Sequence, residues 1–361
     1  MPPETSYIQA IGCATPPTAI ASADAVELFA QACRSPRTAK LMRRVGRLTG
    51  IDQRYLAALG TQLDPAAAHL YQPCAQQPDG PGMGARNGRF AAESTPLVRS
   101  TLGAFSRDAL AQVRTLVTVS CTHASSPGLE RAAFAHAPLR RDVSRWNLGF
   151  MGCSAALAGV RLVHQARQTC GDALLIACEL SSLHFQYSDD LDQLTANLIF
   201  ADGAAATLLT SRPAPARVVD CACAALPEHA DQMVWFADDH GLRLRLAQEL
   251  PDTLRAHVRA AVEPLLGRNG LALEDVRHWL VHPGGPQVLD AVEQALALPD
   301  GALALSRDTL RNFGNMSSPT ILFILRELLE RRGEGHAVAI AFGPGLTIEI
   351  VLLELRQQRG A

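Results

Sequence analysis

The sequence has almost no lysine, no strong charge excess and no long uninterrupted apolar run. Lys40 is the only lysine in a chain of 361 residues with 33 basic ones, so Schiff-base or P-loop lysine chemistry is excluded everywhere else. The formal net charge of −2 argues against a nucleic-acid partner, which would require a strongly basic face. No segment approaches the roughly 18 uncharged apolar residues of a membrane span, so we expect no stable membrane association.

Cysteines are present, but their spacing does not resemble a metal or disulfide framework. There are nine, an odd number; none lies in a CxxC pair, and Cys221 and Cys223 are too close together for the usual zinc knuckle. The segment from Met1 to Ala10 lacks a basic stretch followed by an apolar one, so we expect no signal peptide. These features predict a reduced, cytoplasmic protein without a metal site.

The order of apolar runs and turn residues predicts an α/β protein built from two similar halves. The proline-rich segment SRPAPA separates residues 1–211 from residues 212–361. Buried strands are expected over Thr115 to Val119, Ala173 to Cys178, Ala204 to Thr210, Val276 to Val281, Ala337 to Phe342 and Leu346 to Leu353. Helices are expected from about Leu129 and over Ser154 to Ala166, Gln287 to Leu296 and Met316 to Leu329, and an exposed loop over Gln72 to Gly88. A weak similarity between the two halves of the sequence suggests a duplicated fold with the active site where the halves meet.

Three residues are candidates for chemistry because of their local context. Cys153 follows Gly152 and enters a small-residue helix, whose N-terminus would favour a thiolate, although a packed core cysteine is the simpler alternative. His282 ends a predicted strand before Pro283-Gly284-Gly285, where α/β folds place catalytic groups, or it is an ordinary loop histidine. Asn315 could stabilise an oxyanion with its amide, or simply cap the following helix.

Together these residues lie in segments that resemble a known family. The strings GFMGCSAAL, WLVHPGGPQVLDAVE, NFGNMSSPTILFIL and AFGPGLTIEIVLL, in this order, resemble the type III polyketide synthases of the chalcone synthase superfamily, from about Ile8 to Leu355. Ala341 departs from the usual glycine of the GFGPG-like segment. The related ketoacyl-carrier-protein synthase III typically has Gln-Ala-Asn after its histidine, so Pro283-Gly284-Gly285 favours the polyketide synthases.

The resemblance implies a thiolase-like fold with duplicated αβαβα layers, a homodimer and a triad of Cys153, His282 and Asn315. Cys153 would accept a starter acyl group from coenzyme A. His282 and Asn315 would position malonyl-CoA and stabilise the enolate left by decarboxylation, which then attacks the acyl-cysteine in a Claisen condensation. The substrates would be acyl-CoA and malonyl-CoA, and no other cofactor is expected.

The resemblance also suggests residues of the substrate pocket and its entrance. Phe200 matches a gatekeeper phenylalanine, Leu244 replaces a second one, and His184 and Trp235 fall where plant members carry small residues. The remaining pocket candidates come from the motifs themselves: Ser317, Gly284, Gly285 and Pro344. A basic cluster of Lys40, Arg43, Arg44, Arg47 and Arg54 is either a solvated helix face or the site for the coenzyme A phosphates, for which we name Lys40, Arg43, Arg44 and Arg47.

The starter is less well determined than the family. The SLHFQ-like segment around His184 resembles bacterial members that use fatty acyl starters to make alkylresorcinols or alkylpyrones. The alternatives are a synthase of small aromatics from malonyl units alone, a carrier-protein-dependent ketoacyl synthase, and a catalytically silent acyl-binding protein, against which the intact triad argues.

Overall fold

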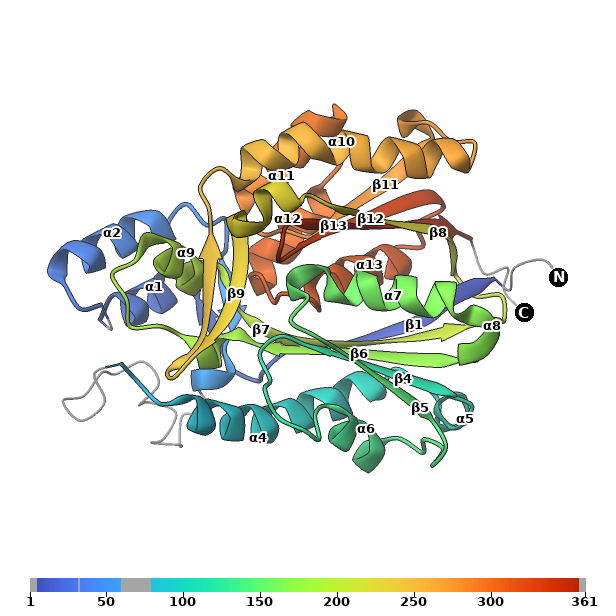
Figure 1. Cartoon of the computed structure of the whole chain (residues 1–361), viewed down its shortest axis with the longest axis horizontal. Helices are drawn as coiled ribbons and strands as arrows, with labels where there is room; N and C mark the ends of the chain where they lie inside the picture. The colour runs from blue at the N-terminus through green and yellow to red at the C-terminus, as the bar shows by residue number, and fades with distance from the viewer. Residues whose placement is uncertain (1–4, 32, 60–78, 357–361) are drawn as a thin grey trace.

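The structure is a computed structural model that describes residues 5–31, 33–59 and 79–356. Two layers of strands alternate with three layers of helices in Figure 1. One helix layer lies between the strand layers, and the other two cover their outer faces. This is an α/β architecture in which every apolar sheet face is covered by helices.

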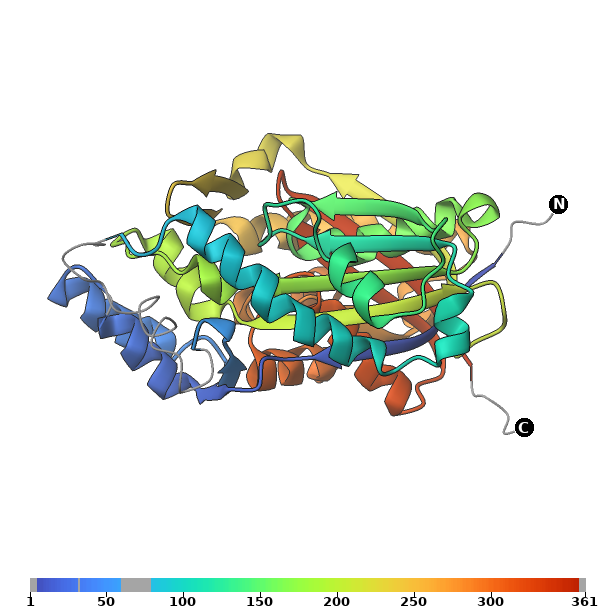
Figure 2. The same cartoon turned by 90° about the horizontal axis from the view of Figure 1, so that it is seen from below.

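The N-terminal half supplies the lower strand layer in Figure 1. Its strands are β1 (Ser6–Ala14), β2 (Ala19–Ala21), β3 (Gln53–Tyr55), β4 (Thr115–Ser120), β5 (Ser144–Gly149), β6 (Ala173–Leu180) and β7 (Asp202–Thr210). Its helices and 3-10 turns are α1 (Ser22–Gln31), α2 (Pro36–Gly46), η1 (Ala57–Leu59), α4 (Met83–Leu102), α5 (Arg107–Ala111), α6 (Glu130–His136), η2 (Gly152–Ser154), α7 (Ala155–Gln165), α8 (Arg167–Cys170), η3 (Ser181–His184) and α9 (Leu191–Ile199). Helix α4 crosses the outer face of this layer, as Figure 2 shows.

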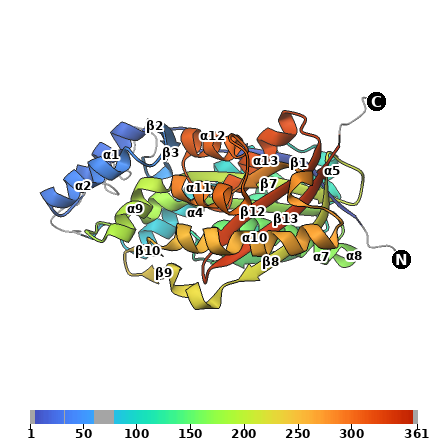
Figure 3. The same ribbon diagram turned by 90° about the horizontal axis from the view of Figure 1, so that it is seen from above.

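The C-terminal half supplies the upper strand layer. Its strands are β8 (Ala216–Ala225), β9 (Met233–Asp238), β10 (Gly241–Leu246), β11 (Val276–Val281), β12 (Gly335–Gly343) and β13 (Thr347–Leu355). Its helices and 3-10 turns are η4 (Pro227–Gln232), α10 (Leu250–Arg268), η5 (Leu273–Asp275), α11 (Pro286–Leu296), α12 (Ala304–Phe313) and α13 (Thr320–Glu330). Figure 3 shows α10 and α11 lying over the strands of this layer.

The same strand pattern occurs twice in the nine-stranded sheet, whose order is β11-β12-β13-β8-β1-β7-β6-β4-β5. In one half β4 is parallel to β6, β6 antiparallel to β7 and β7 antiparallel to β1. In the other, β11 is parallel to β12, β12 antiparallel to β13 and β13 antiparallel to β8. The two patterns join where β1 pairs antiparallel with β8. The topology is therefore duplicated, with the predicted proline-rich break between β7 and β8.

Two apolar helices form the middle layer and position the site. Helix α7 contacts β4 and β6 below it and β12 and β13 above it, and α13 contacts β1, β7 and β11. Both are largely apolar because most of their residues are buried between the strand layers, and the exposed residues Gln165 and Glu330 lie at their C-terminal ends. At Gly159 in α7 a Cβ would overlap the side chain of Leu175, so the helix packs at glycine distance from β6. The N-terminus of α7, which carries Cys153 just before it, is thus held rigidly between the halves.

The predicted strands are confirmed with small shifts of their ends, but two other predictions are wrong. The expected exposed loop over residues 72–88 is helical from Met83, because Arg86 and Phe90 are buried and packing outweighs the low helix propensity of Gly84 and Gly88; residues 72–78 lie outside the described part. The expected helix from Met316 begins only at Thr320, because Ser317 has a φ of 58° and cannot be helical.

Within the described residues, no helix is long and apolar enough to cross a membrane. This agrees with the absence of long apolar runs in the sequence.

Candidate active site

Cys153 lies in the 3-10 turn η2, immediately before α7. The preceding Gly152 has a φ of 62°, and a Cβ there would overlap the ring of Pro344. Glycine is required at this position because the turn at residues 343–345 of the C-terminal half packs directly against its backbone. The nucleophile candidate is therefore placed by a contact between the two halves.

Asn315 is fixed by the other half in the same way. Its backbone N–H donates to Ile199 O (3.1 Å), and its carbonyl accepts from Ala201 N (2.8 Å), so the backbone on either side of Phe200 is tied to it. Its Oδ1 accepts a hydrogen bond from the backbone N–H of Ser317 at 2.8 Å. This bond identifies the amide orientation and leaves the Nδ2 group as a donor for the thiol of Cys153.

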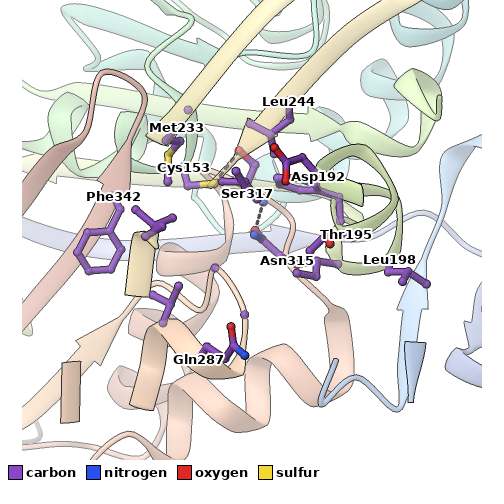
Figure 4. A pocket seen from close by; sticks show the side chains of 18 of the residues that line it. Cys153, Asp192, Thr195, Leu198, Met233, Leu244, Gln287, Asn315, Ser317 and Phe342 are labelled. Atoms are coloured by element: carbon purple, nitrogen blue, oxygen red, sulfur yellow. Dashed lines mark hydrogen bonds between the residues drawn. The ribbon is translucent and has the colours of Figure 1, made fainter. Parts of the chain in front are cut away.

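The sequence offered an N-cap role for Asn315 as the alternative, and the structure excludes it. The N-cap residue of α13 is Pro319, and Asn315 lies four residues earlier in extended backbone paired with the Phe200 segment. Figure 4 shows Cys153, Asn315 and Ser317 pointing toward one another, with Cys153 Sγ 3.5 Å from Ser317 Oγ.

His282 follows β11 and lines the same cavity as Cys153 and Asn315. Only 1% of its surface is exposed, and neither ring nitrogen has a hydrogen-bond partner among the described residues. Burial lowers the pKa of His282 to about 3, so the ring is neutral and offers one N–H donor and one acceptor nitrogen. A buried polar ring without a partner, facing a cavity, is suited to a ligand that brings its own polar atoms.

The protonation state expected for the thiol from the sequence is wrong for this structure. Burial raises the pKa of Cys153 to about 12, although hydrogen bonds from Ser317 and Asn315 lower it. These hydrogen bonds do not compensate for the loss of water around the sulfur. Burial thus favours the neutral form of both the Cys153 thiol and the His282 imidazole.

Glu179 was not anticipated, yet it connects segments that line the site. This carboxylate at the end of β6 is fully buried and accepts hydrogen bonds from the backbone N–H groups of Cys121 and Thr122, from Thr122 Oγ1 (2.6 Å) and from Ser318 Oγ (3.0 Å). It thereby joins the loop after β4 to the segment that carries Asn315. Burial is the main cause that raises the pKa of Glu179 to about 7. A single acidic residue in an otherwise apolar strand was the signal in the sequence.

Cys153, His282 and Asn315, the three residues expected to form a triad, line one cavity of about 500 Å³, within the range of small-molecule sites. Among the expected pocket residues, the cavity is lined by Phe200, Leu244, Trp235, Ser317, Gly284, Gly285 and Pro344. The ring of Phe200 lies 6.2 Å from that of Trp235, whose Nε1 donates to Cys121 O at 3.0 Å. Further lining side chains were not predicted, and most of them are apolar: Val45, Leu48, Leu191, Leu198, Met233, Leu246, Leu250, Leu254, Val288 and Phe342.

His184 is the one expected pocket residue that does not line this cavity. Its ring is buried, with Nε2 2.9 Å from Thr122 O and Nδ1 accepting from Leu242 N at 3.2 Å. Burial lowers the pKa of His184 to about 4. Its side chain connects the loop after β4 to β10 and borders only a small hollow beside the cavity. Its position is therefore that of a neutral connecting group behind the wall.

The basic residues lie on α2 and its end, beside the cavity but not in its wall. Lys40, Arg43, Arg44 and Arg47 are exposed, and Arg43 forms a bidentate ion pair with Glu27, both bonds 2.7 Å. The same stretch contributes Val45 and Leu48 to the cavity wall, and Leu48 is 71% exposed. An exposed apolar rim next to exposed cations is the pattern of an entrance for an acyl group carried by an anionic handle.

Arg54 does not belong to this basic cluster, contrary to the sequence interpretation. Its guanidinium is fully buried and donates to the carbonyls of Leu198 (2.5 Å) and Phe200 (3.3 Å). The sequence could not separate it from the exposed arginines because burial depends on how β3 packs against the end of α9.

Comparison with known proteins decides the family. The family model for the C-terminal domain of chalcone and stilbene synthases matches residues 218–356, and the model for FAE1/type III polyketide synthase-like proteins matches residues 99–220. A 1,3,6,8-tetrahydroxynaphthalene synthase of Streptomyces peucetius subsp. caesius is 31% identical over 360 residues, which cover 96% of this chain and 92% of the relative. The chain belongs to the type III polyketide synthases.

Two further comparisons agree with this assignment. Pks18 of Mycobacterium tuberculosis, described as an alpha-pyrone synthesis polyketide synthase-like protein, is 29% identical over 258 residues, which cover 68% of this synthase and 66% of Pks18. The crystal structure of PKS-I from the brown alga Ectocarpus siliculosus superposes with a TM-score of 0.87 at 25% identity and covers 98% of both chains. The predicted family, the thiolase-like fold and the condensing acyltransferase class are thus confirmed.

Proposed function

We propose that this polyketide synthase loads a fatty acyl group from coenzyme A onto Cys153, extends it with malonyl-CoA and closes the chain to an alkylresorcinol or alkylpyrone. The observation that carries the proposal is the meeting of Cys153, His282 and Asn315 in one largely apolar cavity that opens beside a basic helix. The proposed reaction uses coenzyme A thioesters as substrates and needs no further cofactor.

Loading is a transthioesterification. The sulfur of Cys153 attacks the thioester carbonyl, the bond from that carbon to the coenzyme A sulfur breaks, and the thiol proton ends on the departing coenzyme A. Neutral His282 has a free acceptor nitrogen that can carry this proton between the two sulfurs. The Nδ2 group of Asn315 donates to the oxyanion formed during the attack.

Extension requires an enolate. The carboxylate of malonyl-CoA leaves as CO2, and its bonding electrons remain as the enolate of acetyl-CoA. The N–H of His282 and the amide of Asn315 donate to the enolate oxygen, and neither has a charge that would hold the substrate carboxylate as a salt. The enolate carbon then attacks the acyl carbonyl on Cys153, a carbon–carbon bond forms, and the thiolate leaves and takes up a proton.

The fatty starter is supported by the character of the walls. Leucine, valine, methionine and aromatic side chains form most of the cavity surface, and burial of each CH₂ of a chain among them is worth about 0.8 kcal/mol. The relative Pks18 is described as acting in alpha-pyrone synthesis. A second candidate, a small aromatic from malonyl-CoA alone, is supported by the 31% identity to a tetrahydroxynaphthalene synthase.

The exposed cations of α2 are the proposed site for the coenzyme A phosphates. Lys40, Arg44 and Arg47 have no ion pair among the described residues, whereas Arg43 is held by Glu27. We therefore assign the larger part of phosphate attraction to Lys40, Arg44 and Arg47. Such contacts are screened by salt, so affinity for malonyl-CoA should fall as ionic strength rises.

We also propose a homodimer that forms along the edge of the sheet. Strand β5 is the last strand on its side, and its residues are at least partly exposed. Phe150, which directly follows it, is 51% exposed. An unpaired strand edge continued by an exposed phenylalanine is a surface that a second copy can cover. Light scattering of the purified chain at micromolar concentration tests this; a monomer would contradict it.

Product analysis with acyl-CoA starters of rising length tests the proposed reaction. Each starter is incubated with malonyl-CoA, and products are identified by mass spectrometry. Long-chain starters should give pyrones or resorcinols that retain the alkyl chain, and the Cys153→Ala variant should give none. Conversion of malonyl-CoA alone into an aromatic product, with no incorporation of long starters, would replace the proposal with the small-aromatic alternative. A requirement for acyl carrier protein would instead indicate a ketoacyl synthase.

A further inference from the structure

A second cluster of chemically active side chains lies away from the triad. Glu228 and His229 belong to η4, and His257 belongs to α10. One ligand atom from each of the three lies within 4.8 Å of the other two. The rings of His229 and His257 have centroids 5.4 Å apart and are nearly T-shaped. The sequence predicted no metal site because His257 is distant from the neighbours Glu228 and His229 along the chain and the three follow no recognised ligand spacing.

The backbone holds the two elements in place. The N–H of Leu226, just before η4, donates to Leu346 O at 2.9 Å, and the carbonyl of Gln232, at its end, accepts from Ala247 N at 2.9 Å. On α10, His257 is followed by Val258, which is fully buried. Both ligand-bearing elements are therefore anchored before any ion binds, which limits the entropy lost on binding.

Gln232 lies beside His229 and is placed to orient its ring. Its side-chain amide lies 3.2 Å from Nδ1 of His229, and its Oε1 is buried without a partner among the described residues. The alternative orientation of this amide would let Oε1 accept a hydrogen bond from Nδ1–H. That arrangement gives Nδ1–H an acceptor and leaves Nε2 of His229 unprotonated, while the amide nitrogen of Gln232 takes the buried place of Oε1. Metal-binding histidines are oriented by such a partner on their second nitrogen.

We propose that Glu228, His229 and His257 bind a divalent transition-metal ion such as Zn²⁺. Two imidazoles and one carboxylate are a donor set that zinc accepts in proteins, with water completing a four-coordinate site. The metal would connect η4 to α10 and take no part in the condensation.

The location gives the ion a defined structural effect. Strand β9, which follows η4, carries Met233 and Trp235 in the cavity wall, and the first turns of α10 carry Leu250 and Leu254 in the same wall. A metal bound between η4 and α10 would restrain two sides of the cavity relative to each other. We therefore expect it to protect this wall from local opening.

Calorimetric titration of tag-free protein with Zn²⁺, and absorption of bound Co²⁺, test the site. The wild-type chain should bind one ion, and the loss of one ligand in His257→Ala should abolish measurable binding. Gln232→Ala should weaken it by about 10- to 100-fold, the usual effect of losing a supporting partner. His136→Ala, in α6, is the matched histidine control and should bind as wild type does. Equal binding by His257→Ala and wild type, or no binding by either, would overturn the proposal.

Hydrogen exchange tests the restraint of the wall and does not depend on the proposed reaction. Zn²⁺ should slow exchange of backbone amides over residues 227–235 in the wild type and have no effect in His257→Ala. Binding without such protection would overturn the structural role. Failure of the polyketide assays would leave this result unchanged, so the two proposals fail separately.

Discussion

Replacing Asn315 by alanine should slow decarboxylation of malonyl-CoA far more than replacing Ser317, the other hydrogen-bond partner of the Cys153 thiol. Asn315 provides one fixed donor, because its oxygen is already bound to the N–H of Ser317 at 2.8 Å. Loss of one donor to a developing oxyanion costs about 2.7–4 kcal/mol, or roughly 100- to 1000-fold in rate. The backbone ties of Asn315 to Ile199 and Ala201 do not involve its side chain, so the loop should keep its position.

Ser317→Ala is the matched control. It removes the hydroxyl 3.5 Å from the sulfur of Cys153 but leaves the backbone N–H that orients Asn315. The hydrogen bond from Ser317 lowers the pKa of the Cys153 thiol, so its loss should raise that pKa further and slow acyl loading. Decarboxylation should be almost unaffected.

The two half-reactions are measured separately. Decarboxylation is followed as acetyl-CoA formed from malonyl-CoA in a Cys153→Ala background, where the thiol cannot contribute. Loading is followed as the mass increase of the intact chain after a single turnover with acyl-CoA. If Asn315→Ala slowed decarboxylation less than about tenfold while its melting temperature matched wild type, the assigned role of the amide would be refuted. The same conclusion would follow if Ser317→Ala reproduced the Asn315→Ala pattern.

Three further predictions concern the surroundings of the triad. Gly152→Ala should lower turnover without abolishing folding, because the added Cβ meets Pro344 and forces Cys153 out of line; kcat and circular dichroism of the variant check this. The carboxyl of Glu179 has a pKa raised to about 7 from 4.5, so its stabilising contribution is complete below pH 4.5 and is lost as pH rises to 7, by up to about 3 kcal/mol. The Glu179→Gln variant cannot ionise at this position, so its melting temperature should fall less than that of the wild type between pH 5 and 8. Its overall stability should be lower, because the amide NH2 group would face backbone N–H donors. Arg44→Ala should raise KM for malonyl-CoA with little change in kcat, and KM should depend less on salt. Because Arg43 is already paired with Glu27, Arg43→Ala should change KM less.

Controls for these variants use residues of the same type elsewhere. Asp202 also has a pKa raised to about 7, chiefly by burial, so its own contribution to the pH slope should persist in Glu179→Gln. An unchanged slope in that variant would contradict the assignment to Glu179. Equal effects of Arg43→Ala and Arg44→Ala on KM would show that the ion pair with Glu27 does not restrict Arg43.

Local patterns were sufficient where one short segment determines the feature. The strand from Val276 to Val281 has the ends that the sequence predicts, because its apolar residues Trp279, Leu280 and Val281 are buried and turn residues follow them at Pro283. The helix expected from Met316 failed because the bend at Ser317 is imposed by contacts with Cys153 and the Phe200 segment. The loop expected up to Gly88 failed because glycine propensity is weaker than the packing of Phe90 into the core.

The sequence by itself determined the family and the duplicated fold, and it singled out Cys153, His282 and Asn315 as the expected triad, because these features are encoded in short strings of neighbouring residues. Only the tertiary structure decided that Glu179 joins the Cys121 loop to Ser318, that His184 lies behind the cavity wall and that Arg54 is buried. The protonation state of Cys153 was also outside the reach of the sequence, since a pKa depends on the water and dipoles around the sulfur rather than on its neighbours in the chain. The burial of a side chain and its hydrogen-bond partners are set only when segments from both halves pack together.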